Sequence, residues 1–590
     1  MPKQHGEKKE NTKPEAELHE TFNSFLYTVS MLKKFILPVA ATALVAMTSC
    51  SGKLGALSAD NFTVVPNPME TQGGYVPVTI NGNFPEKYMK KKAVVTVTPE
   101  LRAADGSILR GVPATFQGEK VMGNNQTVSY LLGGHYAMKA EFPYSDTYHK
   151  SDLYLSFDAT IGKKKVEVPA VKVANGIIAT SELYRLAMTQ TGGCIAPDTF
   201  QRVRKERQEA SVKFLINQAQ LRQGELKNNS VKEFLQMLRT INNEKEAYVL
   251  SNIEVKAYAS PDGGEKLNDK LAAKRQNVSE DYVKKQLKNL KVSANVGGQY
   301  TAQDWEGFKQ LVSASNIQDK DVILRVLSMY QDPEEREQQI KNMSAGFREL
   351  ADGILPELRR SRLIINYETV GRSDEEIMQQ YKDNAEKLSN DELLYAAVLQ
   401  GADNAKVEEI YKKTTKIYPN DYRAYNNIAV QELKKGDVNL AKEYLDKALS
   451  LSPKAAEPKA NLALIALKSG NVTKAQEYIS QAIGANDYDF ALGTYNIAKG
   501  DYAAAADNLK GMNNNMAALA QILNKDYESA RVIFKQMANS GDGITDYLRA
   551  VMSARQGNSY AANTYLKDAI AKNGKLAFYA EDDLEFSKIK

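Results

Sequence analysis

From about Leu388 to its end, the chain repeats itself with a period of 34 residues, and no other feature constrains its fold so strongly. Three units are readable, at 388–421, 422–455 and 456–489. In this pattern alanines allow two helices to approach closely, a glycine permits the turn between them, and a proline ends the second helix. The recurring positions are Leu394, Tyr411 and Pro419 in the first unit, Tyr425, Ile428, Ala429, Gly436, Ala441, Leu445, Ala448 and Pro453 in the second, and Leu462, Ala463, Gly470, Ala475, Ile479 and Ala482 in the third. Weaker units follow, so residues 388–590 are predicted to form an all-α solenoid.

These positions resemble the tetratricopeptide repeat. The resemblance implies a superhelix whose concave face holds other proteins. We expect Asn426, Asn427, Asn461 and Tyr495 to line this groove and to contact a protein partner. A purely structural role is the alternative for each of the four.

The beginning of the chain has the pattern of a secretion signal. Residues 31–49 carry two lysines, a short apolar run and then small residues, and the apolar run is shorter than the ~20 residues that a membrane-spanning helix needs. We therefore expect Met31 to be the true start and residues 1–30 to be an upstream extension.

The signal ends in Met-Thr-Ser-Cys, which resembles the bacterial lipobox. The resemblance implies that Cys50 is lipidated and that residues 50–59 are a lipidated linker; a cleaved signal with an incidental cysteine is the alternative. Ser51 stands where an Asp would resemble an inner-membrane retention signal, which favours the outer membrane. The next residues lack an acidic export cluster, so we expect the protein to face the periplasm. Cys194 is the only other cysteine, which leaves no intramolecular disulfide once Cys50 is lipidated.

Residues 60–180 are predicted to form an all-β sandwich. Alternating, β-branched stretches at 75–80, 93–98 and 165–169 are separated by the turn-forming steps Asn81-Gly82, Asp105-Gly106 and Gly133-Gly134. Its two histidines lack the spacing of metal ligands. Residues 181–210, which include a charged run at 202–208, are predicted to be a helical connector.

Residues 211–370 alternate between strand and helix patterns, which predicts a layered α/β domain. Strands are expected at 212–217, 253–258, 292–296 and 362–367, with helices at 231–241 and 265–290. A long helical insert is expected at 301–356, and residues 371–387 are expected to be a linker to the solenoid. The complete prediction is a multidomain chain: an all-β sandwich, a central α/β domain with a helical insert, and an all-α solenoid.

The stretch 258–278, Tyr-Ala-Ser-Pro-Asp-Gly-Gly-Glu-Lys-Leu-Asn-Asp-Lys-Leu-Ala-Ala-Lys-Arg-Gln-Asn-Val, resembles the signature of the OmpA-like, peptidoglycan-associating domain. In that family an Asp in the turn binds the ammonium of the wall peptide and an Arg on the helix binds its carboxylate. The resemblance implies that Asn268 lies near the helix start and that Arg275 binds the carboxylate, which a planar guanidinium can grip with two parallel bonds. Ser260 occupies the Asp position, and Asp262 is the candidate substitute. A surface ion pair of Arg275 with an acid of its own helix, in a domain kept for protein contacts, is the alternative.

No catalytic motif occurs: the chain has no P-loop, G-x-S-x-G, H-E-x-x-H or C-x-x-C. We therefore predict that it is not an enzyme and uses no cofactor or metal. With 77 basic and 72 acidic side chains, and lysines spread along the sequence, we expect neither nucleic-acid binding nor a strong field toward a membrane surface. Two functions follow: an envelope scaffold that binds outer-membrane or secretion and assembly proteins through its repeat groove, with the lipid as its membrane contact, or a tether to peptidoglycan.

Overall fold

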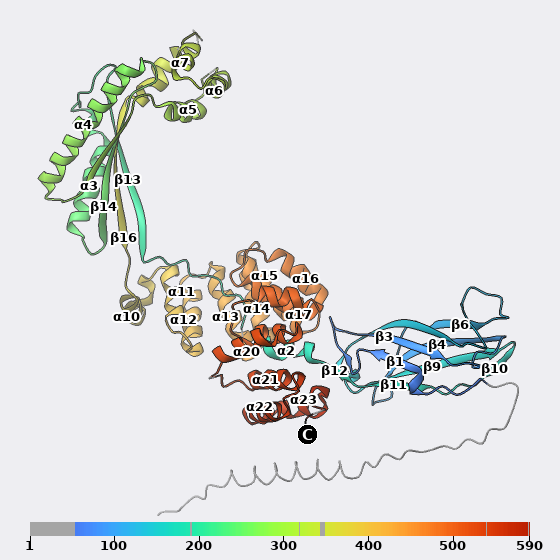
Figure 1. The fold of residues 1–590 in the computed structure, drawn as a ribbon. Helices are drawn as coiled ribbons and strands as arrows, with labels where there is room; N and C mark the ends of the chain where they lie inside the picture. The colour runs from blue at the N-terminus through green and yellow to red at the C-terminus, as the bar shows by residue number, and fades with distance from the viewer. Residues whose placement is uncertain are drawn as a thin grey trace, which may run out of the picture.

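The computed structural model describes residues 54–188, 192–317, 319–342, 348–538, 540–587 and 589. The predicted upstream extension, signal peptide and lipidation site Cys50 lie outside the described residues. The described chain forms three parts: a β domain, an α/β domain and a helical array (Figure 1). None of the helices in these described ranges is both long enough and apolar enough to cross a membrane.

The β domain consists of two main sheets around one core. A three-stranded sheet has the order β1-β3-β8, and a second sheet has the order β10-β9-β4-β6-β7 with β5 and β11 at its sides. Alternate residues of both sheets, such as Val78 on β3 and Val95 on β4, point into the same apolar cluster. This is the arrangement predicted for a sandwich. The strands are β1 (Phe62–Val65), β2 (Met69–Glu70), β3 (Tyr75–Phe84), β4 (Ala93–Arg102), β5 (Ile108–Arg110), β6 (Ala114–Gly118), β7 (Gln126–Val128), β8 (Gly134–Pro143), β9 (Asp152–Ile161), β10 (Lys164–Val166), β11 (Val171–Asn175) and β12 (Ile177–Ile178).

One turn prediction in this domain is wrong. Asn81 and Gly82 lie inside β3, paired with Ala137 and Tyr136 of β8. A Cβ on Gly82 would lie 2.2 Å from the ring of Tyr136, so the glycine makes room for an aromatic ring and does not form a turn.

The α/β domain is a four-stranded sheet with the order β13-β16-β14-β15, covered by α3 and α4, which contact each other and the strands. Its core joins Phe234 of α3 and Val283 of α4 to Val255 of β14. The insert packs as a separate helical cluster around Phe308. The elements are β13 (Val203–Lys213), α3 (Asn229–Asn243), β14 (Tyr248–Tyr258), α4 (Glu265–Leu290), β15 (Val296–Thr301), α5 (Trp305–Ala314), α6 (Lys320–Met329), α7 (Pro333–Asn342), η6 (Leu350–Ile354), α9 (Leu355–Leu358) and β16 (Arg360–Val370).

Four boundary predictions in this region are wrong, and the first is the strand expected at 212–217, because β13 ends at Lys213. The predicted helical connector contains only a short helix, α2 (Tyr184–Ala187), and residues 192–202, which are not helical, lead into β13. This strand pairs with β16 along its whole length, from Val203↔Val370 to Lys213↔Arg360. Charged and polar residues occupy both faces of the first part of β13, where backbone pairing holds the chain extended, whereas Ala210 and Val212 near its end are buried in the core of the domain. The strand expected at 292–296 begins only at Val296, and the linker at 371–387 is largely helix.

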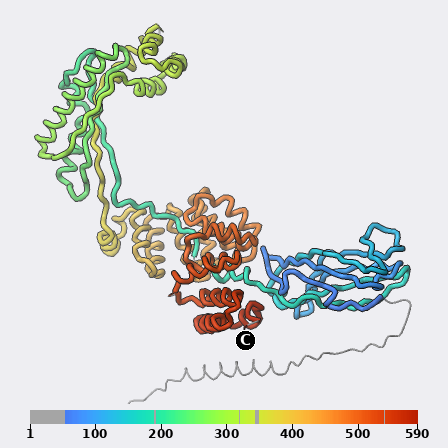
Figure 2. Tube along the Cα trace, in the orientation of Figure 1, coloured from blue at the N-terminus to red at the C-terminus, as the bar shows by residue number. Residues whose placement is uncertain are grey.

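The array consists of stacked antiparallel helix pairs (Figure 2). Gly436, Gly470, Gly500 and Gly557 follow the first helices with positive φ, as turn glycines do. The predicted periodicity of the solenoid is confirmed. The helices are α10 (Asp374–Asn384), α11 (Asn390–Val398), α12 (Asn404–Ile417), α13 (Tyr422–Lys435), α14 (Val438–Leu451), α15 (Ala456–Lys468), α16 (Val472–Gln481), α17 (Tyr488–Lys499), α18 (Tyr502–Asn508), α19 (Asn515–Leu523), α20 (Tyr527–Gln536), α21 (Gly543–Arg555), α22 (Ser559–Lys572) and α23 (Leu576–Asp582).

The array lies between the other two parts although it comes last in the sequence (Figure 1). The chain leaves the β domain, contacts the array through residues within 180–188 and 192–200, forms the α/β domain, and returns to the array after β16. Gln72 of the β domain donates to the carbonyl of Gly500, and Arg555 of α21 pairs with Glu70 at 2.7 Å. The array is therefore the central body of the molecule.

Candidate functional site

The groove of the array is lined by the first helix of successive pairs. Asn426 and Asn427 lie on α13, Asn461 on α15 and Tyr495 on α17, and all four are buried. Asn427, Asn461 and Tyr495 are spaced by 34 residues and so occupy the same position in three consecutive units. The repeat therefore places these side chains in one row.

The groove holds a segment of the same chain. Asn461 accepts a bond from the backbone N–H of Cys194 (2.7 Å) and donates to the carbonyl of Cys194 (2.8 Å). Asn427 makes the same pair of bonds with Ala196, at 2.8 and 3.0 Å. Asn426 adds a second donor to the carbonyl of Cys194 at 3.0 Å. Two amides one repeat apart thus bind backbone groups two residues apart.

The side chains between these amides are also linked. Asn461 donates to Oδ1 of Asn426 (2.9 Å), and Asn426 donates to Oδ1 of Asn427 (3.0 Å). Because all three amides are almost completely buried, each lost bond would leave a polar group without water to replace it. The three asparagines therefore satisfy the backbone groups of residues 194 and 196 in the groove.

Contacts on both sides extend this binding along the array. Arg423 of α13 donates to the carbonyl of Asp198 (3.0 Å) and to the hydroxyl of Thr199 (3.1 Å). Phe200 stacks on Tyr395 of α11 with ring centroids 4.6 Å apart. Upstream, Tyr184 donates to the carbonyl of Leu467. The segment therefore runs from the later repeats toward the earlier ones, antiparallel to the order of the array.

Cys194 lies at the centre of this contact. Its thiol is fully buried and lies 3.4 Å from the carbonyl of Asp487. Burial raises the pKa of the Cys194 thiol far above its ordinary value, so it stays protonated and is a poor nucleophile. Gly193 precedes it at the closest point, where a Cβ would lie 2.3 Å from Oδ1 of Asn461.

Contact of the four groove residues with a separate protein stays a prediction, because in this structure they contact their own chain. The three asparagines bind residues 194 and 196 of their own chain, and Tyr495 packs in the apolar core of the array. The sequence signal that was missed is a pair of asparagines at one repeat position, together with a Gly-Gly step and a proline in the segment at 192–197.

The residues singled out in the α/β domain also come together, at the turn between β14 and α4. Asn268 donates to the carbonyls of Ser260 and Gly263, each at 2.8 Å, and so fixes the turn. Asp262 accepts from the hydroxyl of Ser260 and pairs with Arg359 at 3.0 Å. Arg359 also donates to Ser260 Oγ at 3.2 Å. Arg359 is a member of this cluster that the sequence did not indicate.

Arg275 is buried beneath the turn. It donates to the carbonyls of Tyr258 (2.9 Å), Gln218 (3.0 Å) and Leu215 (3.3 Å), and its guanidinium lies over the ring of Phe214. Burial, and secondly the nearby charge of Arg359, lower the pKa of Arg275 to about 10. The alternative of a surface ion pair is wrong, because the side chain is buried and donates to carbonyls of two backbone segments, 215–218 and the end of β14.

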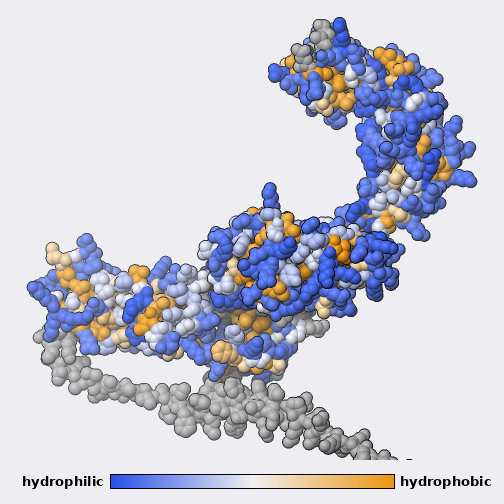
Figure 3. Space-filling view, turned by 180° about the vertical axis from the view of Figure 1, so that it is seen from behind, coloured by the Kyte–Doolittle hydropathy of each residue, from blue (hydrophilic) through white to orange (hydrophobic). Residues whose placement is uncertain are grey.

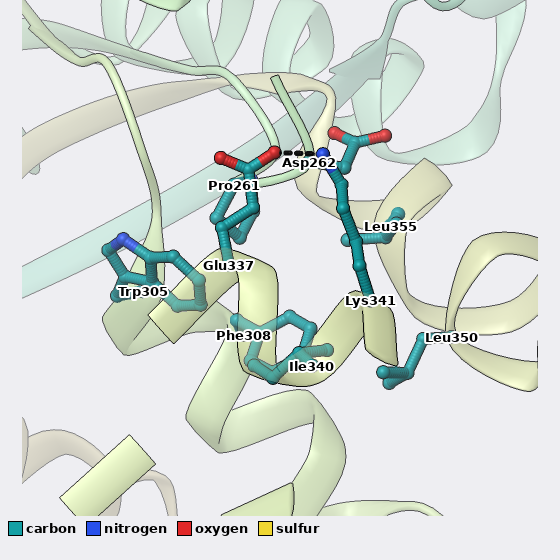
Figure 4. Close-up of a pocket in the computed structure, with 9 residues that line it drawn as sticks. All are labelled: Pro261, Asp262, Trp305, Phe308, Glu337, Ile340, Lys341, Leu350 and Leu355. Carbon is teal, nitrogen blue, oxygen red and sulfur yellow. Dashed lines mark hydrogen bonds and ion pairs between the residues drawn. The ribbon is translucent and has the colours of Figure 1, made fainter. Parts of the chain in front are cut away.

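The insert covers one side of this turn. Pro261 and Asp262 face Trp305, Phe308 and Ile340 across a small hollow (Figure 4). Within residues 54–188 and the other described ranges, no group of three or more His, Cys, Asp or Glu side chains could hold a metal ion.

A family model for the tetratricopeptide repeat matches residues 432–491, from α13 to α17, so this part of the array is a tetratricopeptide repeat. No curated protein matches the chain. Solved structures with a similar fold include pilF of Pseudomonas aeruginosa (17% identity over 34% of this chain and 97% of that one, TM-score 0.25). Another is PilW, a type IV pilus biogenesis factor (18% identity over 33% of this chain and 96% of that one, TM-score 0.25). A third is a tetratricopeptide repeat protein of Parabacteroides merdae (12% identity over 42% of this chain and 98% of that one, TM-score 0.26). The assignment of the repeat rests on the family match and on the observed helix pairs.

Proposed function

We propose that this chain is a non-enzymatic adapter lipoprotein of a bacterial envelope, anchored at Cys50 in the outer membrane and facing the periplasm. The observation that carries the proposal is the binding of residues 194 and 196 by Asn427 and Asn461 in the repeat groove. Tetratricopeptide arrays are protein-binding bodies, and here the array uses its groove to hold the chain that joins its two other domains. The array is then an internal hub, by which we mean the body that holds the β domain and the α/β domain together through its groove. Partner proteins of the envelope bind these two domains and the outer surface of the array.

A filled groove changes where partners are expected. A partner peptide could enter only by breaking the buried bonds at Cys194 and Ala196, and by displacing Phe200 from Tyr395. Each buried polar group left without a partner costs ~1–3 kcal/mol, so displacement is unfavourable unless the partner replaces the same bonds. The β domain, the α/β domain and the outer face of the array are therefore the proposed contact surfaces.

Cross-linking with mass spectrometry in intact cells tests this function on the full chain. Cross-links to other envelope proteins are expected from the β domain, the α/β domain and the outer faces of the helices. Lys434 reports on the groove, because it lies beside Gly192. Cross-links from Lys434 to another protein, with residues 192–200 displaced, would contradict the internal hub. Absence of any cross-linked envelope protein would contradict the adapter.

We keep a peptidoglycan tether as the second candidate function. It is favoured by the resemblance of 258–278 to the OmpA-like domain and by a turn in which Asn268 holds an acid, Asp262, close to Ser260. Arg275 has its donors on backbone carbonyls, so Arg359, which pairs with Asp262, is the candidate cation for the carboxylate of the wall peptide.

Sedimentation with purified sacculi tests the tether. Asp262→Asn should lower the affinity for sacculi by roughly tenfold or more, because a charged partner is worth ~1.5–3 kcal/mol. Asp269→Asn, which changes an exposed acid on the helix α4 that follows the turn, is the matched control and should bind as the wild type does. A wild-type chain that stays in the supernatant would refute the tether.

A further inference from the structure

The end of the β domain far from the array is built from loops that are separate in the sequence. They are residues 85–92 between β3 and β4, 119–125 between β6 and β7, 129–133 between β7 and β8, and the β9–β10 turn. Backbone bonds join them: Lys87 N–H donates to Tyr130 (2.7 Å), Lys120 N–H to Lys91 (2.7 Å), and Gly162 N–H to Lys92 (2.9 Å). We call this surface the free end.

The free end is strongly basic. Residues 85–92, 118–134 and 161–164 contain seven lysines and two glutamates. Six of the lysines are exposed, and Lys90 lies over the ring of Tyr130, 5.0 Å from its centroid. The seven lysines are Lys87, Lys90, Lys91, Lys92, Lys120, Lys163 and Lys164. A chain that is nearly neutral overall therefore carries a local positive surface here.

Large apolar side chains project from the same loops. Met122 is 99% exposed, Leu132 83% and Leu131 64%, which for a packed domain is an unusual concentration at one end. In the space-filling view, hydrophobic residues lie among hydrophilic ones at the end of the β domain away from the array (Figure 3). Exposed apolar loops ringed by lysines match a bilayer surface, where headgroup phosphates meet acyl chains.

The described chain also begins at this end (Figure 1). Gly55 lies against Tyr88 in the first of these loops, 3.4 Å from a ring carbon when a Cβ is built on it. Leu54 is four residues after Cys50, and four residues span at most ~14 Å. A lipid on Cys50 would therefore hold the free end next to the membrane.

We propose that the free end of the β domain rests on an anionic lipid bilayer, with its lysines at the headgroup phosphates and Met122, Leu131 and Leu132 in the interface. The surface binds the membrane in its own right and orients the molecule. Strands such as β3 run from this end to the array, and ten residues at ~3.3 Å place the array about 33 Å further out. The lipid anchor would fix the distance between the β domain and the membrane, and the free end would fix the tilt of the molecule on the membrane.

Vesicle co-sedimentation of the unlipidated chain from Ser51 onward tests this surface apart from the anchor. We expect it to bind vesicles of equal parts phosphatidylcholine and phosphatidylglycerol, to bind phosphatidylcholine alone weakly, and to lose binding as salt rises. Lys163→Glu with Lys164→Glu should lower partitioning by about 25-fold or more, since each lysine near an anionic surface strengthens partitioning by about fivefold.

Leu131→Asp with Leu132→Asp should lower binding to the mixed vesicles as well. Both positions are exposed, so these changes leave the fold intact, and unchanged circular dichroism and thermal midpoint verify this. Val532→Asp with Tyr560→Asp, exposed apolar residues of the array, is the matched control and should bind normally. Absence of binding to anionic vesicles would overturn the proposal, and so would binding that all variants retain. Loss of a captured envelope protein in Leu131→Asp/Leu132→Asp, without vesicle binding by the wild type, would identify the free end as a protein contact instead. None of these outcomes depends on lipidation or on the adapter function, so the proposals fail separately.

Discussion

Asn461→Ala is the substitution that most directly tests the filled groove. It removes three bonds: one accepted from Cys194 N–H, one donated to the carbonyl of Cys194, and one donated to Asn426. The carbonyl of Cys194 keeps a donor, Asn426, whereas Cys194 N–H and Asn426 Oδ1 lose the partners recorded for them. At ~1–3 kcal/mol for each unsatisfied buried group, the contact weakens by about 2–6 kcal/mol.

Hydrogen exchange read by mass spectrometry measures this change. The amides at 192–196 should exchange about 30-fold faster or more, because every 1.4 kcal/mol is a factor of ten. The amides of α15 should keep most of their protection, since the helix packs through Ala463 and Leu467 on the array core. Asn439→Ala, an exposed asparagine on α14, is the control and should change nothing. Wild-type exchange at Cys194 in Asn461→Ala would refute the view that the asparagines hold the segment.

Three further results are expected. Gly193→Ala should speed exchange at 192–196 and leave α/β-domain stability unchanged, because the new Cβ would lie 2.3 Å from Oδ1 of Asn461; normal exchange would show that the backbone has room there. Arg275→Ala should lower the urea stability of the α/β domain by about 3–5 kcal/mol, and Arg275→Lys should recover only part of it, because one ammonium cannot reach three carbonyls; an unchanged urea midpoint would contradict the structural role. The pKa of Glu392 is lowered below its ordinary value of 4.5. Burial alone would raise this pKa, but the hydrogen bonds from the Ser389 N–H and the Arg372 guanidinium to the carboxylate outweigh the burial. Its stabilising contribution is therefore complete above pH 4.5 and is lost as the pH falls below that value, so the thermal midpoint of Glu392→Gln should fall less on acidification than that of the wild type, and equal falls would argue against this linkage.

Local patterns in the sequence were sufficient for most elements. The repeat of alanine, glycine and proline positions predicted the solenoid, because each unit is stabilised mainly by its neighbours in sequence. The helix at 265–290 was predicted with its observed bounds as α4. Charged periodicity failed at 203–210, where pairing with β16, more than 150 residues away, holds the chain as a strand.

The candidate site was predicted only in part. The sequence identified the three groove asparagines but assigned them to another protein, because a repeat position shows that a side chain faces the groove and says nothing about what fills it. It also placed Arg275 on the right helix, yet its burial follows from the approach of residues 214–218 to α4, which no local pattern encodes.

By itself, the sequence determined the solenoid, the β-rich start of the described chain and the alternation of strand and helix between them, since these depend on short-range spacing. Only the tertiary structure decided that the array stands in the middle, that residues 192–200 occupy its groove, and that lysines spread along the sequence meet at one end of the β domain. Those three features depend on contacts between residues that are distant in the sequence, and they arise from long-range packing, which the spacing of residues along the chain does not record.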